Sequence, residues 1–200
     1  MKLDIRRYSP SDFQRLVEVY QSAFAEPPWD EYMRCNFCGI NYGVLESQQS
    51  TENCKKCESP LQLVPFWSVE DIRADLDFAS SQPAATGLVA EVDKKLIGFI
   101  WGYRLPFNKF PFLREKVSND AIYVDDIAVR GDCRLKGIGK SLCVSFLSEV
   151  FSPAINSSES VLRTDRRNVA SMGLFSSVGF KEIGITDPKF PFRVYLAKRR

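Results

Sequence analysis

Residues 124–146 read VDDIAVRGDCRLKGIGKSLCVSF, and this stretch decides the fold. Its first six residues are mostly apolar, as is typical of a strand, and its last nine have the amphipathic spacing of a helix. Between them, Gly137 and Gly139 let another group approach the main chain where the first N–H groups of the helix have no partner. The helix dipole favours negative charge there by about 0.3–1 kcal/mol, and three basic residues reinforce it: Arg134, Lys136 and Lys140. The stretch therefore predicts an anion site, suited to phosphate, at the start of a helix.

Two better-known glycine motifs do not fit this loop. A P-loop has the pattern G-x-x-x-x-G-K-[ST]; Gly139-Lys140-Ser141 supplies its end, but Arg134 stands where its first glycine belongs. A dinucleotide-binding loop has the pattern G-x-G-x-x-G, and Leu142 stands in place of its third glycine. A glycine-rich helix start without any ligand is the plain alternative.

The segments on both sides of this stretch alternate between strand-like and helix-like patterns. Apolar alternation predicts strands over 2–8, 87–93, 95–105, 121–129, 160–164, 179–187 and 192–198. Apolar stripes at helical spacing predict helices over 9–24, 68–79, 138–151 and 168–178. Ser68, followed three residues later by Asp71, forms an approximate capping box at the start of the second helix. We expect one α+β domain over residues 1–200, interrupted by an insert at 33–66.

The composition indicates an ordinary globular chain, because 44% of its 200 residues are hydrophobic and 26% are charged. Lys and Arg number 27 against 25 Asp and Glu, so the net charge of +2 gives no reason to expect a polyanionic partner. The first residues, MKLDIRRYSPSDF, carry charges where a signal peptide needs an apolar run, and nowhere do eighteen apolar residues follow one another. We therefore expect a cytoplasmic protein that has no membrane partner.

Four of the six cysteines form two Cys-x-x-Cys pairs inside the insert. Fifteen residues separate the two pairs, a spacing typical of a four-thiolate zinc site, here built by Cys35, Cys38, Cys54 and Cys57. Disulfides or another soft metal are the alternatives, but a chain without an export signal is expected in a reducing compartment. Four thiolates leave no open coordination position, so we expect the Zn²⁺ of this ribbon to be structural.

The charges of the ribbon argue against nucleic acid as a partner. Four charged residues lie between Cys35 and Cys57, and they sum to zero: Glu46, Glu52, Lys55 and Lys56. A surface that binds the phosphate backbone needs an excess of positive charge. We expect the ribbon to act as a brace or as one wall of a substrate pocket.

The loop and two later motifs resemble the GNAT superfamily of acyltransferases. The R-x-x-G-x-G pattern of that family is matched, directly after a strand, by Arg134, Gly137 and Gly139. Asn168 precedes a helix that is followed by Gly179-Phe180, which looks like the closing G-F of the family. The resemblance covers the chain outside residues 33–66. It implies a mixed, mainly antiparallel sheet flanked by helices, and an N-acetyltransferase that uses acetyl-CoA.

The resemblance also implies which residues hold acetyl-CoA. The end of the strand is expected to hydrogen-bond the pantetheine arm through the main chain of Ile127, Ala128 and Val129. The loop is expected to hold the pyrophosphate through Arg134, Leu135, Lys136, Gly137, Ile138, Gly139 and Lys140. Asn168 is expected to contact the same arm, and it can equally be the N-cap of its helix.

Acetyl transfer requires a neutral amine, and a lysine-like amine has a pKa of about 10.4, so a nearby group must take its proton. The sequence contains no histidine, which leaves carboxylates as the leading candidates. Asp125 and Asp126 lie in the strand before the loop, and strand alternation predicts that they point to opposite faces, with one in the cleft. The stretch YVDDIAV, residues 123–129, resembles the acidic pair of polyamine-type family members, where carboxylates hold or deprotonate the acceptor. A solvent-exposed aspartate at a strand edge is the alternative.

Phe175 departs from the family pattern, because family members commonly have a tyrosine there that protonates the departing thiolate. The general acid is therefore unassigned. Tyr123, Tyr195 or water could substitute, since a thiolate whose thiol has a pKa of about 8.5 is a tolerable leaving group.

The acceptor is expected to be a small amine or polyamine in preference to a protein N-terminus, because Glu26 and Asp30 add further acidic groups near Trp29. Two other functions stay open. One is an acyl-CoA sensor or protein-interaction module without turnover, and the other is a zinc-ribbon protein that binds nucleic acid. The sequence does not indicate an oligomeric state.

Overall fold

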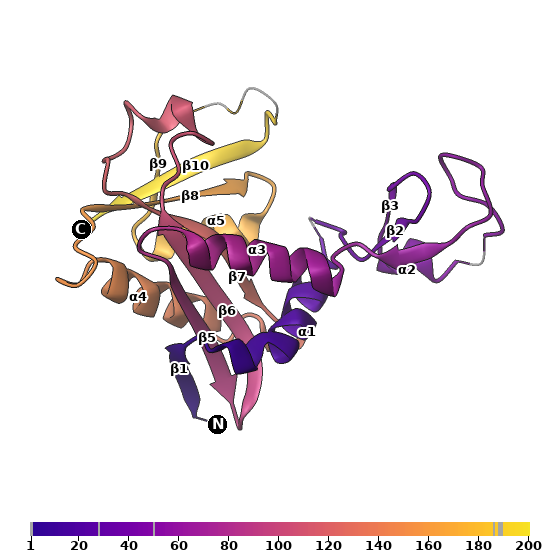
Figure 1. Ribbon diagram of the computed structural model, residues 1–200, viewed down its shortest axis with the longest axis horizontal. Coiled ribbons are helices and arrows are strands. Elements are labelled where there is room, and N and C mark those ends of the chain that lie inside the picture. Colours follow the sequence, from indigo (N-terminus) through magenta and orange to yellow (C-terminus); the bar gives the residue numbers. More distant parts are fainter. Residues whose placement is uncertain (1, 28, 50, 186, 188–189) are drawn as a thin grey trace.

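Seven strands form one mixed sheet: β1 (Leu3–Arg7), β5 (Thr86–Val92), β6 (Lys95–Arg104), β7 (Ile122–Val129), β8 (Glu159–Asp165), β9 (Lys181–Glu182) and β10 (Arg193–Arg199). A computed structural model describes residues 2–27, 29–49, 51–185, 187 and 190–200. The strand order is β1-β5-β6-β7-β8-β10-β9 (Figure 1). β7 and β8 pair in parallel, and the other neighbours pair antiparallel. The expected α+β fold with a mainly antiparallel sheet is confirmed.

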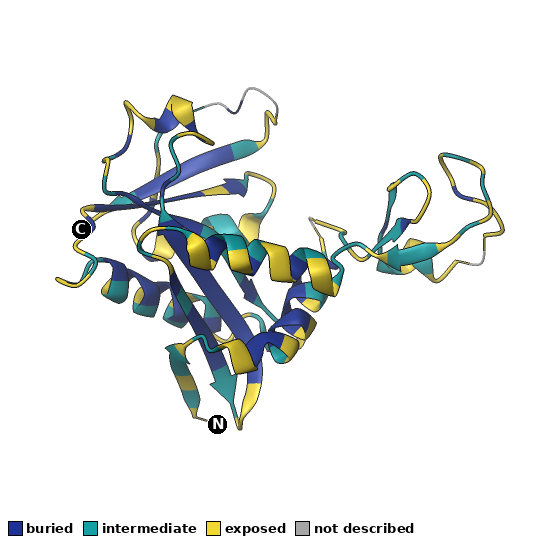
Figure 2. Cartoon of the chain, viewed as in Figure 1, coloured by how far each residue is buried: buried dark blue, intermediate teal, exposed yellow. Residues whose placement is uncertain are grey.

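Helices cover both faces of this sheet, and Figure 2 shows the central strands buried between them. One face carries α1 (Phe13–Phe24) and α3 (Val69–Ser81), and the other carries α4 (Ile138–Val150) and α5 (Val169–Ser177). The side chains of β7 enter two hydrophobic cores, with Tyr123 and Ala128 on the α1 side and Val124 on the α4 side. Short 3₁₀ turns lie at Pro10–Asp12, Pro111–Leu113 and Gly131–Cys133. In the described part of the chain, no helix is long and apolar enough to cross a bilayer.

Local sequence signals explain several boundaries. Ser68 caps α3 as expected, because the Asp71 N–H donates to its Oγ over 3.0 Å and its own N–H donates to the Asp71 carboxylate over 3.3 Å. Asp93 and Lys94 have φ angles of 49° and 64°, the left-handed pair that a tight hairpin between β5 and β6 requires.

The strand expected over 179–187 is wrong in extent. Among the described residues, Lys181–Glu182 pair with β10 and the Ile183 N–H donates to the Tyr195 carbonyl over 3.0 Å, and the chain then turns at Gly184, where φ is 67°. A residue in this left-handed conformation does not continue a strand. Residue 186, which belonged to this expectation, lies outside the described residues.

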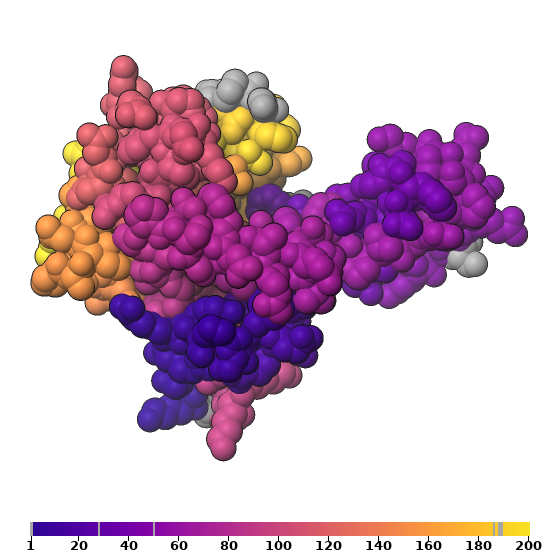
Figure 3. Space-filling view, in the orientation of Figure 1, coloured from indigo at the N-terminus to yellow at the C-terminus, as the bar shows by residue number. Residues whose placement is uncertain are grey.

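The cysteine segment, residues 33–66, forms a second sheet. Its elements are β2 (Met33–Cys35), β3 (Asn41–Tyr42), β4 (Leu63–Pro65) and the one-turn helix α2 (Val44–Ser47). The strand order is β3-β2-β4, and three buried residues form its core: Cys35, Tyr42 and Cys54. The segment leaves the main body between α1 and α3 and projects as a separate lobe (Figure 1, Figure 3).

Candidate functional site

β7 contains a bulge at its two aspartates. Trp101 of β6 faces Asp126 and Gly102 faces Val124, so Asp125 is an extra residue without a cross-strand partner. An extra residue interrupts the regular alternation of side chains along a strand. Both aspartates can therefore point to the same face of the sheet.

Hydrogen bonds to the two carboxylates show that they do share one face. The Tyr103 hydroxyl donates to Asp125 over 2.9 Å, and the Tyr20 hydroxyl donates to Asp126 over 3.2 Å. Both tyrosines belong to the core on the α1 and α3 side of the sheet. The expectation that the carboxylates face opposite sides is wrong, because it assumed a regular strand.

A third carboxylate, that of Asp75 in α3, lies beside this pair. Burial raises the pKa of Asp126 well above its ordinary value, and the charges of Asp125 and Asp75 raise it further. Burial also raises the pKa of Asp125, while the hydrogen bond from Tyr103 and the charge of Arg163 oppose the rise. Burial and the charge of Asp125 raise the pKa of Asp75. Such a cluster favours a bound cation, which would stabilise the charged carboxylates.

The sequence reasoning missed Asp75, Tyr20 and Tyr103. Asp75 lies three residues after the fully buried Ile72 and one before Leu76, so it borders the buried face of α3. An acidic residue beside the buried face of a helix is uncommon, and this position was the one sign in the sequence that Asp75 could belong to a functional site. The tyrosines have only 2% and 3% of their surface exposed, so their pattern indicated core residues and gave no sign of the hydroxyl contacts.

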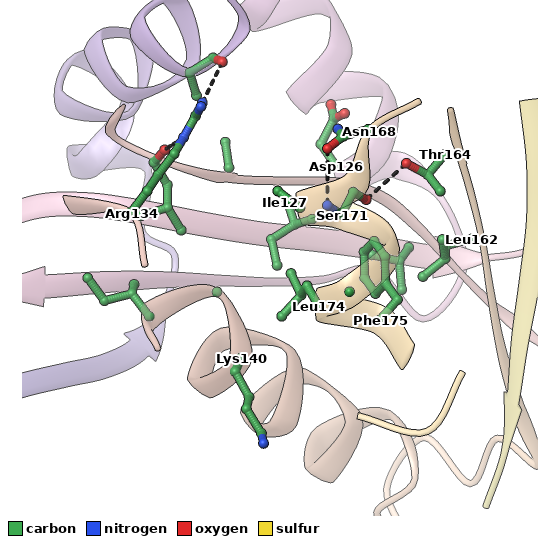
Figure 4. A pocket seen from close by; sticks show the side chains of 18 of the residues that line it. Asp126, Ile127, Arg134, Lys140, Leu162, Thr164, Asn168, Ser171, Leu174 and Phe175 are labelled. Carbon is green, nitrogen blue, oxygen red and sulfur yellow. Dashed lines mark hydrogen bonds between the residues drawn. The ribbon is translucent and has the colours of Figure 1, made fainter. Parts of the chain in front are cut away.

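β7 and β8 part after a short paired stretch and leave a cavity between them. Their parallel pairing joins only residues 122–124 to residues 160–162. Beyond it, both strands line a cavity of about 780 Å³, together with the loop before α4 and with α5 (Figure 4). In the described part of the chain, no strand pairs with the main-chain groups of β7 on this side. Asp125 and Asp126 line the cavity at its acidic end.

Of the residues predicted to hold the cofactor, all but Lys136 line this cavity. The ammonium group of Lys136 instead donates to the Asp132 carbonyl over 3.0 Å. The structure thus gathers the rest of the predicted set around one space, between the strand end, the loop and Asn168.

The glycine loop, residues 130–140, presents a row of main-chain donors. From Leu135 to Lys140, no amide donates a hydrogen bond to another described residue. Leu135 and Gly137 have φ angles of 62° and 79°, and left-handed residues in a turn direct N–H groups toward one concave side. A side chain on Gly137 would meet nothing within 4 Å, so glycine is needed there for its conformation, whereas a Cβ on Gly139 would lie 3.3 Å from Leu174. This geometry suits an anion.

The side chain of Arg134 is directed to the main body of the protein. Its guanidinium pairs with Glu26 over 2.6 Å. It also donates to the carbonyls of Ala23 and Val129 over 2.9 and 3.2 Å, and Figure 4 shows Arg134 in this arrangement. These bonds tie the end of α1 to the end of β7. The side chain therefore holds the loop in place, and a direct contact with pyrophosphate stays a prediction.

Asn168 caps α5, because its Oδ1 accepts a hydrogen bond from the Ser171 N–H over 3.0 Å. The Thr164 hydroxyl of β8 donates to Ser171 Oγ over 2.9 Å and joins the helix to the sheet (Figure 4). The N-cap interpretation is confirmed, and a contact to a ligand stays a prediction. Phe175 also lines the cavity and packs edge to face on Phe180, with ring centroids 5.5 Å apart.

The tyrosines considered as general acids lie elsewhere. Tyr123 is buried on the α1 side of the sheet, its hydroxyl has no hydrogen-bond partner among the described residues, and burial raises its pKa. The Tyr195 hydroxyl donates to Asp187 over 2.8 Å, and burial followed by this bond raises its pKa to about 12. Neither side chain is among those that line the cavity.

The four paired cysteines come together as predicted. Their Sγ atoms all lie within 4.8 Å of one another, with 3.6 Å between Cys38 and Cys54 and 3.9 Å between Cys35 and Cys57. In a tetrahedral site with Zn–S bonds of about 2.3 Å, the sulfurs are about 3.8 Å apart. A disulfide would bring two sulfurs to about 2.05 Å, and all these cysteines are free. The donor set therefore fits a tetrahedral metal ion.

Solved acetyltransferase structures share this fold. The chain is similar to the PaiA N-acetyltransferase from Thermoplasma acidophilum, solved with coenzyme A, at 19% identity and a TM-score of 0.64 over 100% of both chains. It is also similar to yncA, a putative acetyltransferase from Salmonella typhimurium solved with acetyl-CoA, at 14% identity and a TM-score of 0.61 over 98% of this chain and 93% of that one. For the ribosomal-protein-S18-alanine N-acetyltransferase from Escherichia coli, the identity is 16% and the TM-score 0.58 over 99% and 94%.

A search of curated protein sequences gave no match. The sequence profile of the acetyltransferase (GNAT) family, in contrast, matches residues 50–180. This range begins inside the cysteine segment and extends through the bulged strand, the glycine loop and α5 to Phe180. The chain therefore belongs to the GNAT family of acetyltransferases.

Proposed function

We propose that the protein transfers the acetyl group of acetyl-CoA to a cationic small amine or polyamine, in preference to a protein N-terminus. The observation that carries the proposal is the bulge of β7, which turns Asp125 and Asp126 to one side, next to Asp75. An ammonium group among these carboxylates would offset the unfavourable burial of their charge. Three carboxylates exceed what one ammonium group neutralises, which favours a diamine or polyamine over a single amine.

The cavity between β7 and β8 is the proposed site of acetyl-CoA, which supplies an activated acetyl thioester when bound. Its volume of about 780 Å³ is within the range of small-molecule sites. The main chain of residues 127–129 pairs with β6 on one side, and its other side, beyond the ladder with β8, would hydrogen-bond the pantetheine arm. The free amides of residues 135–140 would hold the pyrophosphate, and Asn168 would contact the same arm.

Asp125 and Asp126 are the proposed amine anchors and proton acceptors. An amine with a pKa of about 10.4 arrives protonated at neutral pH, and the carboxylates hold it in that form. One carboxylate takes a proton from the ammonium group, directly or through water, and the neutral amine that results attacks the thioester carbonyl. Their raised pKa values make them stronger bases than ordinary aspartates. The hydroxyls of Tyr20 and Tyr103 orient the two groups.

The departing thiolate is proposed to leave without a protein acid. Phe175 offers no proton at the position where the family commonly has a tyrosine. A thiol with a pKa of about 8.5 is acidic enough for its thiolate to leave unprotonated. The nitrogen loses its second proton to water as the thiolate departs, and water returns a proton to the thiolate.

Residues 33–66 are proposed to be a zinc ribbon inserted into a single acetyltransferase domain that spans residues 1–200. Cys35, Cys38, Cys54 and Cys57 would hold a structural Zn²⁺, which would supply the stability that a three-residue core lacks. The separations between their sulfurs support this proposal. A cytoplasmic location would keep the thiols reduced.

The test is an amine panel incubated with the protein and acetyl-CoA, with release of free thiol as the readout. Polyamines and diamines are expected to be acetylated faster than monoamines, and peptides with free N-termini more slowly than either. Faster turnover of peptides would overturn the acceptor assignment. If calorimetry detects acetyl-CoA binding but no panel member is acetylated, the protein is an acyl-CoA sensor instead.

A further inference from the structure

The two ends of the cysteine segment are tied to the end of α1 by hydrogen bonds. The Trp67 indole N–H donates to the Glu31 carboxylate over 2.8 Å, and the Glu31 N–H donates to the Phe24 carbonyl over 2.9 Å. The Gln21 side chain donates to the Trp67 carbonyl over 2.8 Å. Glu31 precedes the segment and Trp67 follows it, so these bonds fix its base on the main body.

Trp67 also packs against the tyrosine that reaches Asp126. The rings of Trp67 and Tyr20 meet edge to face with centroids 5.3 Å apart, and Phe24 supports Tyr20 from another side at 4.6 Å. Tyr20 has 2% of its surface exposed, so its ring has little freedom. Its hydroxyl lies 3.2 Å from Asp126. Trp67, at the base of the cysteine segment, is thus one of the side chains that fix the position of the Tyr20 ring and, with it, the hydrogen bond to Asp126.

The base is held together by β2, which ends at the first thiolate, Cys35, and by its partner β4. β2 and β4 pair through only three residue pairs, from Met33 with Pro65 to Cys35 with Leu63, and Phe66 N–H donates to the Tyr32 carbonyl over 3.0 Å. So short a ladder is marginal without further support. A metal on Cys35 and its three partners would supply that support, because zinc binding in small ribbons is coupled to their folding.

We infer that Trp67 and Glu31 are positioning residues for Tyr20 and Asp126, so that a metal in the cysteine segment governs use of the acceptor amine without affecting acetyl-CoA binding. The inference rests on the proposed function for the role of Asp126. The path runs from the thiolates through β2 and β4 to Trp67, and from its ring to the Tyr20 hydroxyl. The acetyl-CoA cavity is lined by neither Trp67 nor Glu31.

The experiment is a double-mutant cycle of Trp67→Ala and Tyr20→Phe, with Trp67→Phe and Glu31→Gln as milder variants. Trp67→Ala is expected to lower kcat/KM for the amine by about tenfold or more and to leave the Kd of acetyl-CoA within about twofold. In the Tyr20→Phe background, where no hydroxyl needs positioning, Trp67→Ala should change kcat/KM by less than about twofold. The control is Leu45→Ala, a change at a 77% exposed side chain of α2, which should be silent.

Removal of the metal gives an independent arm. A chelator should lower amine kcat/KM of the wild type to the level of Trp67→Ala, and it should have little effect on that variant. Additive effects of Trp67→Ala and Tyr20→Phe, or an equal loss of acetyl-CoA affinity, would overturn the inference and leave a purely structural contact. Where Trp67→Ala fails to fold, Trp67→Phe takes its place in the cycle.

A readout without turnover separates this inference from the proposed function. NMR of the Asp126 carboxyl carbon reports its titration directly in the wild type, Tyr20→Phe and Trp67→Ala. If no amine is acetylated by the wild type, the proposed function fails. The NMR titration still decides whether Trp67 is coupled to the hydrogen bond between Tyr20 and Asp126. A titration of Asp126 that shifts in Tyr20→Phe but not in Trp67→Ala overturns the coupling, whereas a shift in both supports it.

Discussion

The glycine loop and the cysteine segment are the two proposed binding regions outside the acidic cluster, and they would bind with different groups. The loop offers its main chain: among the described residues, the amides of 135–140 have no partner, and their direction is set by Leu135 and Gly137 beside a large core. The cysteine segment uses four side chains, and its own core consists of three buried residues. The proposed anion site would therefore be formed before its ligand arrives, whereas the segment would depend on the proposed metal ion for stability.

The two regions should also fail in different ways. A defect in the loop should weaken ligand binding and leave the fold intact. A defect in the cysteine segment should unfold that lobe and leave the loop intact, because the main sheet has two hydrophobic cores that do not include the segment.

The largest effect is expected from Cys54→Ser, which removes one thiolate. Structural zinc contributes about 10–16 kcal/mol in isolated fingers, so the cysteine segment should lose both its metal and its fold. Elemental analysis should find about one zinc per chain in the wild type and almost none in the variant. Calorimetry should find acetyl-CoA affinity within about twofold of the wild type. Cys133→Ala, outside the cluster, is the matched control and should keep its zinc; zinc-free wild-type protein prepared without chelator would contradict the assignment.

The next effect is expected at the bulge, with Asp125→Asn and Asp126→Asn. Loss of a general base lowers turnover by about 10²–10⁴-fold, and we expect at least one variant in this range. Since both carboxylates share one face, the other variant should also be impaired, through a raised KM for the amine. Steady-state kinetics on the best amine of the panel measures both. A fully active second variant would mean that only one aspartate reaches the acceptor.

A smaller effect is expected from Gly137→Val in the loop. A left-handed conformation is unfavourable by about 1–2 kcal/mol for an ordinary residue and more for a β-branched one, so acetyl-CoA binding should weaken by about tenfold or more. Gly137→Asn is the matched control, because asparagine tolerates this conformation and space is open around the position. Calorimetry should rank the affinities as wild type, Asn, Val. Equal affinities for Asn and Val would show that backbone conformation is not what matters here.

The smallest effect concerns stability and pH. The pKa of Asp126 is raised by burial, so the native state holds more protons than the unfolded state between about pH 4 and the raised pKa, and stability falls as pH rises through that window. Asp126→Asn should therefore raise the Tm at neutral pH, by about 2–4 °C for each kcal/mol gained in the free energy of unfolding. This gain should shrink toward pH 4. Thermal melts across this range check it; a variant less stable than the wild type throughout would contradict it.

Asp12 provides the opposite control. Hydrogen bonds from Arg6 lower the pKa of Asp12 to about 2, so its contribution to stability is present above about pH 4 and is lost as pH falls toward 2. Asp12→Asn should lower the Tm at neutral pH, and the difference from the wild type should shrink in acid.

Most of the framework could be predicted because its signals are local. The glycine loop follows a strand and precedes a helix as its sequence indicates, and the spacing of the cysteines brings four sulfurs together. Ser68 marks the start of α3 and Asp93-Lys94 marks the turn between β5 and β6, because a helix cap and a hairpin turn each depend only on residues that are close in the sequence.

The bulge could not be predicted from β7 alone, because its cause lies partly in the neighbouring strand. A side chain on Gly102 would lie 2.3 Å from the Tyr123 carbonyl, so the two strands approach too closely there for any other residue. Glycine inside a strand often marks such an approach. The sequence did not reveal that Asp75 lies beside Asp125 or that Glu26 pairs with Arg134, because each contact joins residues that are far apart in the sequence.

The positions of the tryptophans make intrinsic fluorescence a reporter of ligand binding at the proposed active site. The chain has three, and each lies at a different part of the proposed active site: Trp29 lines the cavity, Trp67 packs on Tyr20, and Trp101 is the partner of Asp126 on the neighbouring strand. Their intrinsic fluorescence should respond to occupancy of the cavity and of the acidic end without any added label. Proteins that retain a single tryptophan would resolve the order in which acetyl-CoA and the amine bind.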